Sequence, residues 1–441
     1  MDDLDSQLYD VDITKLFFTD LNGKLMNLSV NKQALKNIVE NGVGFDGSSI
    51  AGYASVEHSD RLLFPDLESF KKVTFSNKTV GFLVGNVHNE EGAPASTDPR
   101  HLLQRVIAEA EEEFGYRFFV GPEYEFFLLN GDEFDLSSNN EFSDAVHSDN
   151  AGYFHSTPHD KGELIRHEIT KILADCGIQY EKSHHEVTPS QHEINLEYTD
   201  TLSAADRSLL FTYITQKVAE ENGFYASFMP KPFEDYNRNA FHMHLSLFDK
   251  DGNNLFYDQK MEKNLSSTAK NFIGGILKYA RETSIIMAST VNSYKAYVIE
   301  KEAPIVRGWG FRNRSSMVRV PYALSSEATR IELRSPDPSG NVYLQMAVLI
   351  SMGLQGIREK LECNSPDKGS TYERNYDVRV WDERFLPRCF YEALVEAEKS
   401  TFMKEVLGDS LYNNFMQLKI QEWEDDRVHI PKREHQRYLN V

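Results

Sequence analysis

The segment Gly121-Pro122-Glu123-Tyr124-Glu125-Phe126-Phe127 places two carboxylates two residues apart inside an otherwise apolar run. Because successive side chains of a β-strand point to opposite faces, Glu123 and Glu125 are expected on one face and Tyr124 on the other. The segment therefore predicts a strand that carries its charge on a single face.

Three later segments also carry charged side chains in strand-like runs, and two of them repeat the spacing of two residues. They contain Glu186 and Glu193 in HHEVTPSQHE, His242 and His244 in HMH, and Arg330, Glu332 and Arg334 in RIELR. Met243 and Leu333 are expected on the opposite faces of their strands. One such segment alone is more often the wetted face of an amphipathic sheet, but four in one chain favour a shared site.

The donors in these segments are those that hard divalent cations prefer. The set comprises five carboxylates and one imidazole: Glu123, Glu125, Glu186, Glu193, Glu332 and His242. This number of donors suffices for two or more cations, and the missing thiolates argue against a dedicated zinc site. We therefore expect Mg²⁺ or Mn²⁺, although an isolated His242 would more often be a satisfied core histidine.

Arginines gather in the same part of the chain as the last of these segments. Arg312, Arg314 and Arg319 occur in FRNRSSMVR, and Arg330 and Arg334 follow. Guanidinium groups grip phosphate oxygens in pairs and stabilise the charge of a phosphoryl group in transfer. The alternative is a surface salt-bridge face, for which Arg312 is the strongest candidate. Together with the carboxylates, the arginines predict a metal-nucleotide site.

Composition and charge limit the class of protein. The chain has 441 residues, of which 40% are hydrophobic and 26% charged, as in a globular protein long enough for two domains. A formal net charge of -21 argues against nucleic acid or an anionic membrane as a partner. Three cysteines without CxxC spacing, and an acidic N-terminus with no signal pattern, predict a cytoplasmic protein.

The order of elements predicts an α+β protein. A hairpin over 11–30, a helix over 31–40 and strands within 71–87 predict a small mixed-sheet domain over 1–97. Asp98-Pro99 is typical of a helix start, and the larger domain, 98–441, begins there. Its strands are expected at 117–129, 179–198, 224–231 and 241–248, interleaved with helices at 162–174, 203–221 and 268–283. Surface loops are expected over 130–150 and 233–240.

At this point the chain resembles the type I glutamine synthetase family over nearly its whole length, and most of all the branch without the adenylylation loop. The motifs that carry the resemblance are FDGSSI from Phe45, Ser59-Asp60, GPEYEFF, AGYF from Ala151, HHEVTPSQHE, FMPKP from Phe228, HMH, NSYK from Asn292, EAP from Glu302, RNRS and RIELRSPDPS. The resemblance implies a β-grasp N-terminal domain and a catalytic domain with a curved antiparallel sheet and flanking helices. It also implies a dodecamer with active sites between neighbouring subunits.

The same resemblance implies metal and nucleotide ligands. Glu125, Glu186 and Glu193 match the ligands of one metal, and Glu123, His242 and Glu332 match those of the other. ATP contacts fall on Glu181, His244, Ser246, Arg314, Arg319 and Arg330. Arg334 falls where the family holds the phosphorylated carboxylate.

The implied reaction transfers the ATP γ-phosphoryl group to a carboxylate and then replaces it with an amine. Phosphorylation makes a carboxylate oxygen a leaving group, and a base must deprotonate ammonium before it can attack. Asp46, from the neighbouring subunit, matches that base, and Glu302 matches the flap that shields the intermediate from water. The ammonium pocket matches Ser49, Asp60, Tyr153 and Glu186.

Two departures from the family pattern fall on the side of the acid substrate. The arginine that follows NSYK in the family and clamps glutamate is Ala296 here, and the family's glycine-rich stretch reads Asn237-Arg238-Asn239-Ala240. Arg238 in place of glycine restricts the backbone at this position and fills part of the space beside the substrate with a long cation. We predict that Arg238, beside Asn237 in the substrate site, either replaces the lost clamp or accepts a different acid.

These departures leave three readings of the function. The first is an active ligase for ammonia or another amine, with glutamate or a related acid, including enzymes of the γ-glutamyl-amine type. The second is a catalytically silent relative that keeps the dodecamer and binds nucleotide as a regulator, but complete metal ligands argue against it. A phosphagen kinase is the third, and it leaves FDGSS and EAP unexplained.

Overall fold

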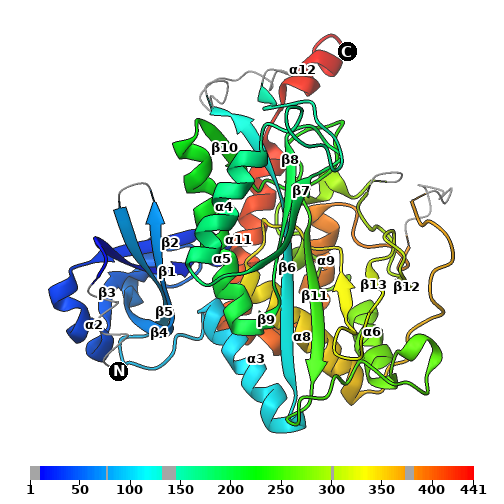
Figure 1. The fold of residues 1–441 in the computed structure, drawn as a ribbon, viewed down its shortest axis with the longest axis horizontal. Helices are drawn as coiled ribbons and strands as arrows, with labels where there is room; N and C mark the ends of the chain where they lie inside the picture. The colour runs from blue at the N-terminus through cyan, green and yellow to red at the C-terminus, as the bar shows by residue number, and fades with distance from the viewer. Residues whose placement is uncertain (1–9, 76–77, 132–145, 299–301, 373–381) are drawn as a thin grey trace.

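The computed structural model describes residues 10–75, 78–131, 146–298, 302–372 and 382–441. Figure 1 shows a small N-terminal sheet beside a larger body of one long sheet and many helices. Most of the expected 130–150 loop lies outside the described residues. In the described part of the chain, no helix combines the length and apolarity that crossing a membrane requires.

The N-terminal sheet has five strands in the order β2-β1-β5-β4-β3. Its elements are β1 (Ile13–Thr19), β2 (Leu25–Val30), α2 (Leu35–Asn41), β3 (Val43–Asp46), β4 (Asp60–Phe75) and β5 (Lys78–His88). The β1–β5 pair is parallel and the other pairs are antiparallel, so the predicted mixed sheet is confirmed. β4 begins earlier than the sequence indicated, at Asp60, and contains a register shift between Asp66 and Lys71.

The predicted β1–β2 hairpin is confirmed, and its turn contacts the larger part of the molecule. Gly23 has φ +89, and a Cβ on it would lie 2.8 Å from the backbone of Asn341. Asn341 donates hydrogen bonds from Nδ2 to Thr19 Oγ1 (3.0 Å) and to the carbonyl of Asp20 (2.8 Å). Glycine therefore serves here both for its backbone conformation and for close approach.

The catalytic sheet has nine strands, with seven in the order β12-β13-β14-β11-β6-β8-β7 and with β9 and β10 paired to β6. They are β6 (Arg117–Asn130), β7 (Tyr180–His185), β8 (Gln191–Leu196), β9 (Thr199–Asp200), β10 (Phe224–Ser227), β11 (Phe241–Phe248), β12 (Trp309–Phe311), β13 (Val318–Val320) and β14 (Ile331–Leu333). Its pairs are antiparallel apart from the parallel β12–β13 pair. The expected 179–198 strand is thus two strands joined by a turn, and Glu186 lies in that turn.

Helices cover the apolar side of this sheet. The helices of this part of the chain are α3 (Pro99–Phe114), α4 (Glu163–Asp175), α5 (Thr201–Glu221), α6 (Ser267–Tyr279), α7 (Ser284–Met287), α8 (Val342–Arg358), α9 (Phe390–Lys399), α10 (Thr401–Leu407) and α11 (Asp409–Val428), followed at the C-terminal end by α12 (Lys432–Tyr438), which buries no residue. The three predicted helices correspond to α4, α5 and the greater part of α6. Asp98 caps α3 by accepting from Arg100 N (3.1 Å), and Gly115 ends the helix at φ 68, as expected.

One apolar core extends from the N-terminal sheet into the catalytic part. Phe17 and Phe82 of the small sheet belong to the same buried cluster as Phe211 of α5. Arg100, whose side chain is 3% exposed, pairs with Asp66 of β4 (2.7 Å) and with Asp206 of α5 (2.8 Å). α4 and α5 contact β4, which Figure 1 shows beside them. The two parts are held together by this shared core and buried ion pairs.

Candidate active site

The strand registers bring the predicted charged residues to one face of the catalytic sheet. Glu123 of β6 faces His242 of β11, and Glu125 faces Glu193 of β8. Glu332 of β14 lies opposite His244 on β11 and opposite Arg319 on β13. The other face is apolar, because Tyr124, Met243 and Leu333 are buried in the core. The alternation predicted from the sequence is therefore confirmed for β6, β11 and β14, but it does not hold for Glu186, which lies in the turn after β7.

The first group of donors consists of Glu123, His242 and Glu332. One potential ligand atom from each residue lies within 4.8 Å of the others. Glu123 Oε1 lies 3.0 Å from His242 Nδ1, and Asn195 of β8 donates to the other oxygen. Burial opposes ionisation of Glu123, but the hydrogen bonds from His242 and His244 outweigh it and hold its pKa well below the usual range. Glu123 is therefore ionised although its side chain is buried in the wall of the site.

Two arginines lock the remaining carboxylate of this group. Glu332 accepts from Arg319 Nη1 at 2.5 Å and from Arg334 Nη1, and its side chain is only 1% exposed. Burial would raise the pKa of Glu332, but the charge of Arg334 outweighs it and lowers the pKa below its usual range. Burial and Arg334 also lower the pKa of His242, which keeps that imidazole neutral and able to act as a ligand.

The second group consists of His184, Glu186 and Glu193, with Glu125 beside them. One ligand atom from each of the three lies within 4.8 Å of the others, and His184 Nε2 is 3.0 Å from Glu193 Oε1. Glu125 accepts from Gln191 Nε2 (3.2 Å) and from Ala240 N (2.8 Å). His184 was not among the expected site residues, although it precedes Glu186 by two positions.

The electrostatics of this second group favour a bound cation. Burial and the neighbouring charges of Glu186 and Glu193 raise the pKa of Glu125 well above its usual value. Burial and Glu193 also raise the pKa of Glu186 to about 7. Buried carboxylates that repel one another in this way form a donor set that a hard divalent cation would stabilise. The residues present therefore fit Mg²⁺ or Mn²⁺.

We predict that cation binding to this group is stronger in alkaline solution. Glu186 has its ordinary pKa in the unfolded chain and a pKa of about 7 in the folded protein. Its protonated form therefore stabilises the fold at a pH below the ordinary pKa, and this stabilisation is lost as the pH rises through about 7. A divalent cation needs the ionised form. The rise in melting temperature on adding Mn²⁺ should be larger at about pH 8 than at about pH 6, and Glu186→Gln should reduce this difference. An equal rise at both pH values would contradict the prediction.

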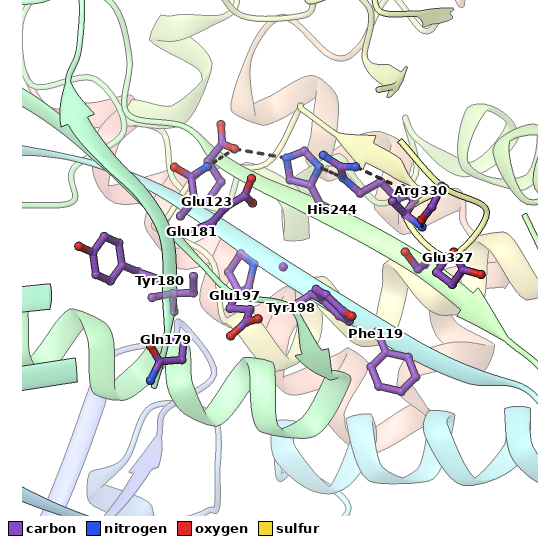
Figure 2. Close-up of a pocket in the computed structure, with 17 residues that line it drawn as sticks. Phe119, Glu123, Gln179, Tyr180, Glu181, Glu197, Tyr198, His244, Glu327 and Arg330 are labelled. Carbon is purple, nitrogen blue, oxygen red and sulfur yellow. Dashed lines mark hydrogen bonds and ion pairs between the residues drawn. The ribbon is translucent and has the colours of Figure 1, made fainter. Parts of the chain in front are cut away.

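A cavity of about 610 Å³ opens beside the first group of donors. Figure 2 shows Glu123, His244 and Arg330 linked in a row along its wall. Arg330 Nε donates to His244 Nδ1 (3.1 Å), so the proton of that ring is on Nε2, which faces Glu123 Oε2 at 3.3 Å. Four of the expected nucleotide contacts line the cavity, namely Glu181, His244, Ser246 and Arg330.

Aromatic side chains in this cavity were not expected from the sequence. Tyr180, Tyr198 and Phe119 line it, and the rings of Phe119 and Tyr198 meet edge to face with centroids 6.3 Å apart. Flat aromatic surfaces beside cationic groups are suited to a heterocyclic base joined to phosphates. Arg319 lines neither this cavity nor the next, because Glu332 holds it in the wall. Arg312 lies 4.5 Å from the ring centroid of Tyr322 and also lines neither cavity.

A second cavity, of about 430 Å³, contains the second group of donors and shares Glu123 with the first cavity. Besides the predicted metal ligands on β6, β8 and β11, seven of the expected site residues line it: Tyr153, Glu186, Asn237, Arg238, Glu302, Arg314 and Arg334. Tyr372, which the sequence did not indicate, also lines it and donates to the carbonyl of Arg314 (3.0 Å). The two cavities therefore meet where the carboxylates of the first group lie.

Three expected residues lie elsewhere on the same chain. Asp46 ends β3 and accepts from Ser48 and from Ser49 Oγ (2.6 Å), and Asp60 faces Asp46 across the β3–β4 pair. None of Asp46, Ser49 and Asp60 lines either cavity. Their assignment to the amine therefore requires a second copy of the chain, as the sequence resemblance implies, and stays a prediction.

Behind the second cavity, Asp149, His185 and Ser190 form a buried hydrogen-bonded cluster with the backbone of Lys161, called the hub below. It connects the segments that carry Tyr153 and Glu186. Asp149 Oδ1 lies 3.0 Å from His185 Nε2 and accepts from Ser190 N at 3.0 Å, while Oδ2 accepts from Lys161 N at 3.1 Å. The other nitrogen of His185 is 2.6 Å from the carbonyl of Glu186. Because both partners of His185 are acceptors, the ring carries two protons. This hub was not indicated by the sequence pattern.

Comparison with known proteins agrees with this arrangement. A family model described as "Glutamine synthetase, catalytic domain" matches residues 96–438, and "Glutamine synthetase, beta-Grasp domain" matches residues 10–90. Glutamine synthetase of Methanosarcina mazei is 38% identical over 98% of this chain and 95% of its own length. That of Pyrococcus furiosus is 38% identical over 96% of this chain and 93% of its own length.

Solved structures show the same fold. A structure described as a GmaS/ADP complex has a TM-score of 0.87 and 29% identity, with all of both chains covered. Plasmodium falciparum glutamine synthetase has a TM-score of 0.86 and 24% identity, over 99% of this chain and 98% of that chain. The α+β class, the β-grasp N-terminal domain and the curved catalytic sheet with its helices are confirmed. The chain belongs to the glutamine synthetase family of ATP-dependent ligases.

Proposed function

We propose that this protein joins a carboxylic acid, with glutamate as the first candidate, to ammonia or a small amine at the expense of ATP. The observation that carries this proposal is the meeting of two cavities at Glu123, between two groups of metal-type donors. A nucleotide in the first cavity would point its phosphates at this junction. An acid in the second cavity would present its carboxylate there from the other side.

The metal roles follow the two donor groups. Glu123, His242 and Glu332 would hold one divalent cation, and Glu125, Glu186 and Glu193 would hold another, with His184 beside Glu193. Bound cations would neutralise phosphate charge and polarise the transferred phosphoryl group. Arg314 and Arg334, which line the second cavity, would bind the oxygens on which charge develops. Arg319 would act through Glu332 instead of through a direct nucleotide contact.

The acid side of the second cavity contains Arg238 in a position suited to a clamp. Its side chain is buried, and it donates to the carbonyls of Ser335 (2.9 Å) and Arg334 (2.5 Å). The guanidinium carbon lies 5.9 Å from the ring centroid of Tyr297, the residue next to Ala296. Its Nε has no hydrogen-bond partner among the described residues. Arg238 thus brings a cation close to the position that lacks the family's arginine.

We predict that Arg238→Ala raises the KM for the acid about a hundredfold and changes the KM for ATP little, because Arg238 lines only the second cavity. Arg238→Lys keeps the charge without the fork and should recover only part of the affinity. Steady-state kinetics with each substrate varied in turn would measure both constants. An unchanged KM for the acid in both variants would reject the replacement clamp.

The amine side contains Glu186, Tyr153 and Glu302. Asn237 Nδ2 donates to Glu302 Oε2 at 2.7 Å, which connects the loop after β10 to the segment that the family uses as a flap. Asp46, Ser49 and Asp60 of a neighbouring copy would complete this pocket in a dodecamer, with Asp46 as the base that deprotonates ammonium.

We place the protein in the cytoplasm and its domain boundary at residue 97.

A direct assay tests the proposed reaction. The full chain is incubated with ATP, Mg²⁺, ammonia and a panel of acids, and ADP release and amide formation are measured together. We expect ADP and amide in equal amounts with glutamate or a close analogue, and hydroxamate formation when hydroxylamine replaces ammonia. ATP cleavage without an amide from any acid, or no cleavage at all, would overturn the proposal.

A second candidate differs only in the amine. It is motivated by the exposed aromatic rings of Tyr153 and Phe154 beside His184. Stacked aromatic rings next to a carboxylate favour an alkylammonium ion over ammonium. A lower KM for methylamine than for ammonia in the same assay would favour this candidate.

A further inference from the structure

Lys182 lies on the same sheet face as the proposed metal ligands. It belongs to β7 two residues before His184, and it faces Asn195 of β8 across the strand pair. A register shift between Tyr180 and Lys182 interrupts that pairing. Such irregularities re-aim side chains near active sites. Lys182 therefore ends the row of charged side chains that runs across the sheet.

The ammonium group of Lys182 interacts with carboxylates of both donor groups. Its Nζ is 3.6 Å from Glu193 Oε1, and the carboxylates of Glu123 and Glu181 also attract it electrostatically. Asn195, its cross-strand neighbour, donates to Glu123. Its side chain is 46% exposed, and the distance to Glu193 is too long for a hydrogen bond. Among the described residues Lys182 is thus held by charge without a hydrogen bond, and its exposure lets the ammonium move toward solvent.

The oxygen that Lys182 approaches is one that a divalent cation would need. Glu193 Oε1 is also the atom nearest His184 Nε2, at 3.0 Å, within the second donor group. A cation bound there would repel the ammonium at this short range, since both are positive. Without a divalent cation, the ammonium offsets part of the repulsion among Glu125, Glu186 and Glu193.

We propose that Lys182 is a built-in cation that competes with a divalent metal ion for Glu193 and so lowers the metal affinity of the second donor group. The inference rests on the proposed function, in which Glu193 is a metal ligand. Lys182 stabilises the metal-free protein, and a metal ion displaces its ammonium toward solvent. It is a positioning residue for the metal and has no contact with the reacting atoms.

Manganese titration of the full-length protein tests this inference, with Mn²⁺ as the only ligand. Lys182→Met keeps much of the aliphatic stem without the charge, and Lys182→Arg keeps the charge. Lys182→Met should bind Mn²⁺ about tenfold more tightly, an effect limited by the exposure of the side chain. Its melting temperature should be lower than that of the wild type without metal and should approach it at saturating Mn²⁺. The Mn²⁺ affinity and the melting temperature of Lys182→Arg should stay close to those of the wild type.

A matched control is Lys217→Met on α5, which removes a lysine that pairs with Glu220 on the same helix and not with a donor group. It should leave the Mn²⁺ affinity unchanged. If the wild type binds no Mn²⁺, the metal assignment in the proposed function fails. If the wild type binds Mn²⁺ and Lys182→Met binds it equally or less tightly, only the role of Lys182 fails. Weaker ADP binding by Lys182→Met with unchanged Mn²⁺ affinity would likewise overturn it and indicate a phosphate contact.

Discussion

Replacement of Glu332 by alanine is expected to reduce ligase activity at least about a thousandfold and to destabilise the fold by about 3–5 kcal/mol. Glu332 pairs with Arg319 and Arg334, whose side chains are 17% and 8% exposed. Removal of this carboxylate would leave two poorly solvated cations unpaired beside His242. Amide formation and the free energy of unfolding in urea would be measured on the same preparation.

The matched control for Glu332 is an exposed ion pair of the same kind. Glu113 pairs with Arg358, and these side chains are 45% and 35% exposed. Because water screens such a pair, Glu113→Ala should cost only about 0.2–1 kcal/mol and leave activity intact. Wild-type stability in Glu332→Ala would show that the two arginines find other partners and would contradict the electrostatic account of this wall.

Replacement of Asp149 by alanine should disrupt the amine side of the site and cost about 3–5 kcal/mol of stability. Its side chain is 1% exposed, and it compensates the charge of a fully buried His185. It also accepts from the backbone of Ser190 and Lys161. Without it, the turn that carries Glu186 and the segment that carries Tyr153 lose their common anchor.

The kinetic signature distinguishes this effect from general unfolding. In Asp149→Ala we expect the KM for ammonia to rise at least about tenfold, with a smaller change in the KM for ATP, because Asp149 is linked to the second cavity and not to the first. Asp149→Asn keeps an acceptor for the backbone donors, so its KM for ammonia should lie between that of Asp149→Ala and that of the wild type. Equal changes in both constants would contradict a specific role for the hub.

Part of the site could be predicted because it depends on local geometry. Side chains alternate along any strand, so the spacing of Glu123, Glu125 and His242 was sufficient to place their charges on one face. The same rule should have identified Lys182 and His184, which share the alternation of β7. Neither was among the expected site residues, because the strand that carries them ends before Glu186 and the motif was assigned to one longer strand.

Glu186 shows the limit of this approach. It lies in the turn between β7 and β8, where Ser190 has φ 64, and no alternation applies there. Its place is decided by Asp149, which contacts His185 from 36 residues earlier in the chain. A local pattern contains no information about such a partner.

The sequence by itself determined the strands that carry Glu123, His242 and Glu332, their charged faces and the family, since each of these is recorded in spacing and in motifs. Only the tertiary structure decided which strands are neighbours, that the two cavities meet at Glu123, and that Arg238 lies against the carbonyls of Arg334 and Ser335. The physical reason is that strand order and loop placement follow from how apolar faces pack together, and residues that are far apart in the chain jointly determine that packing.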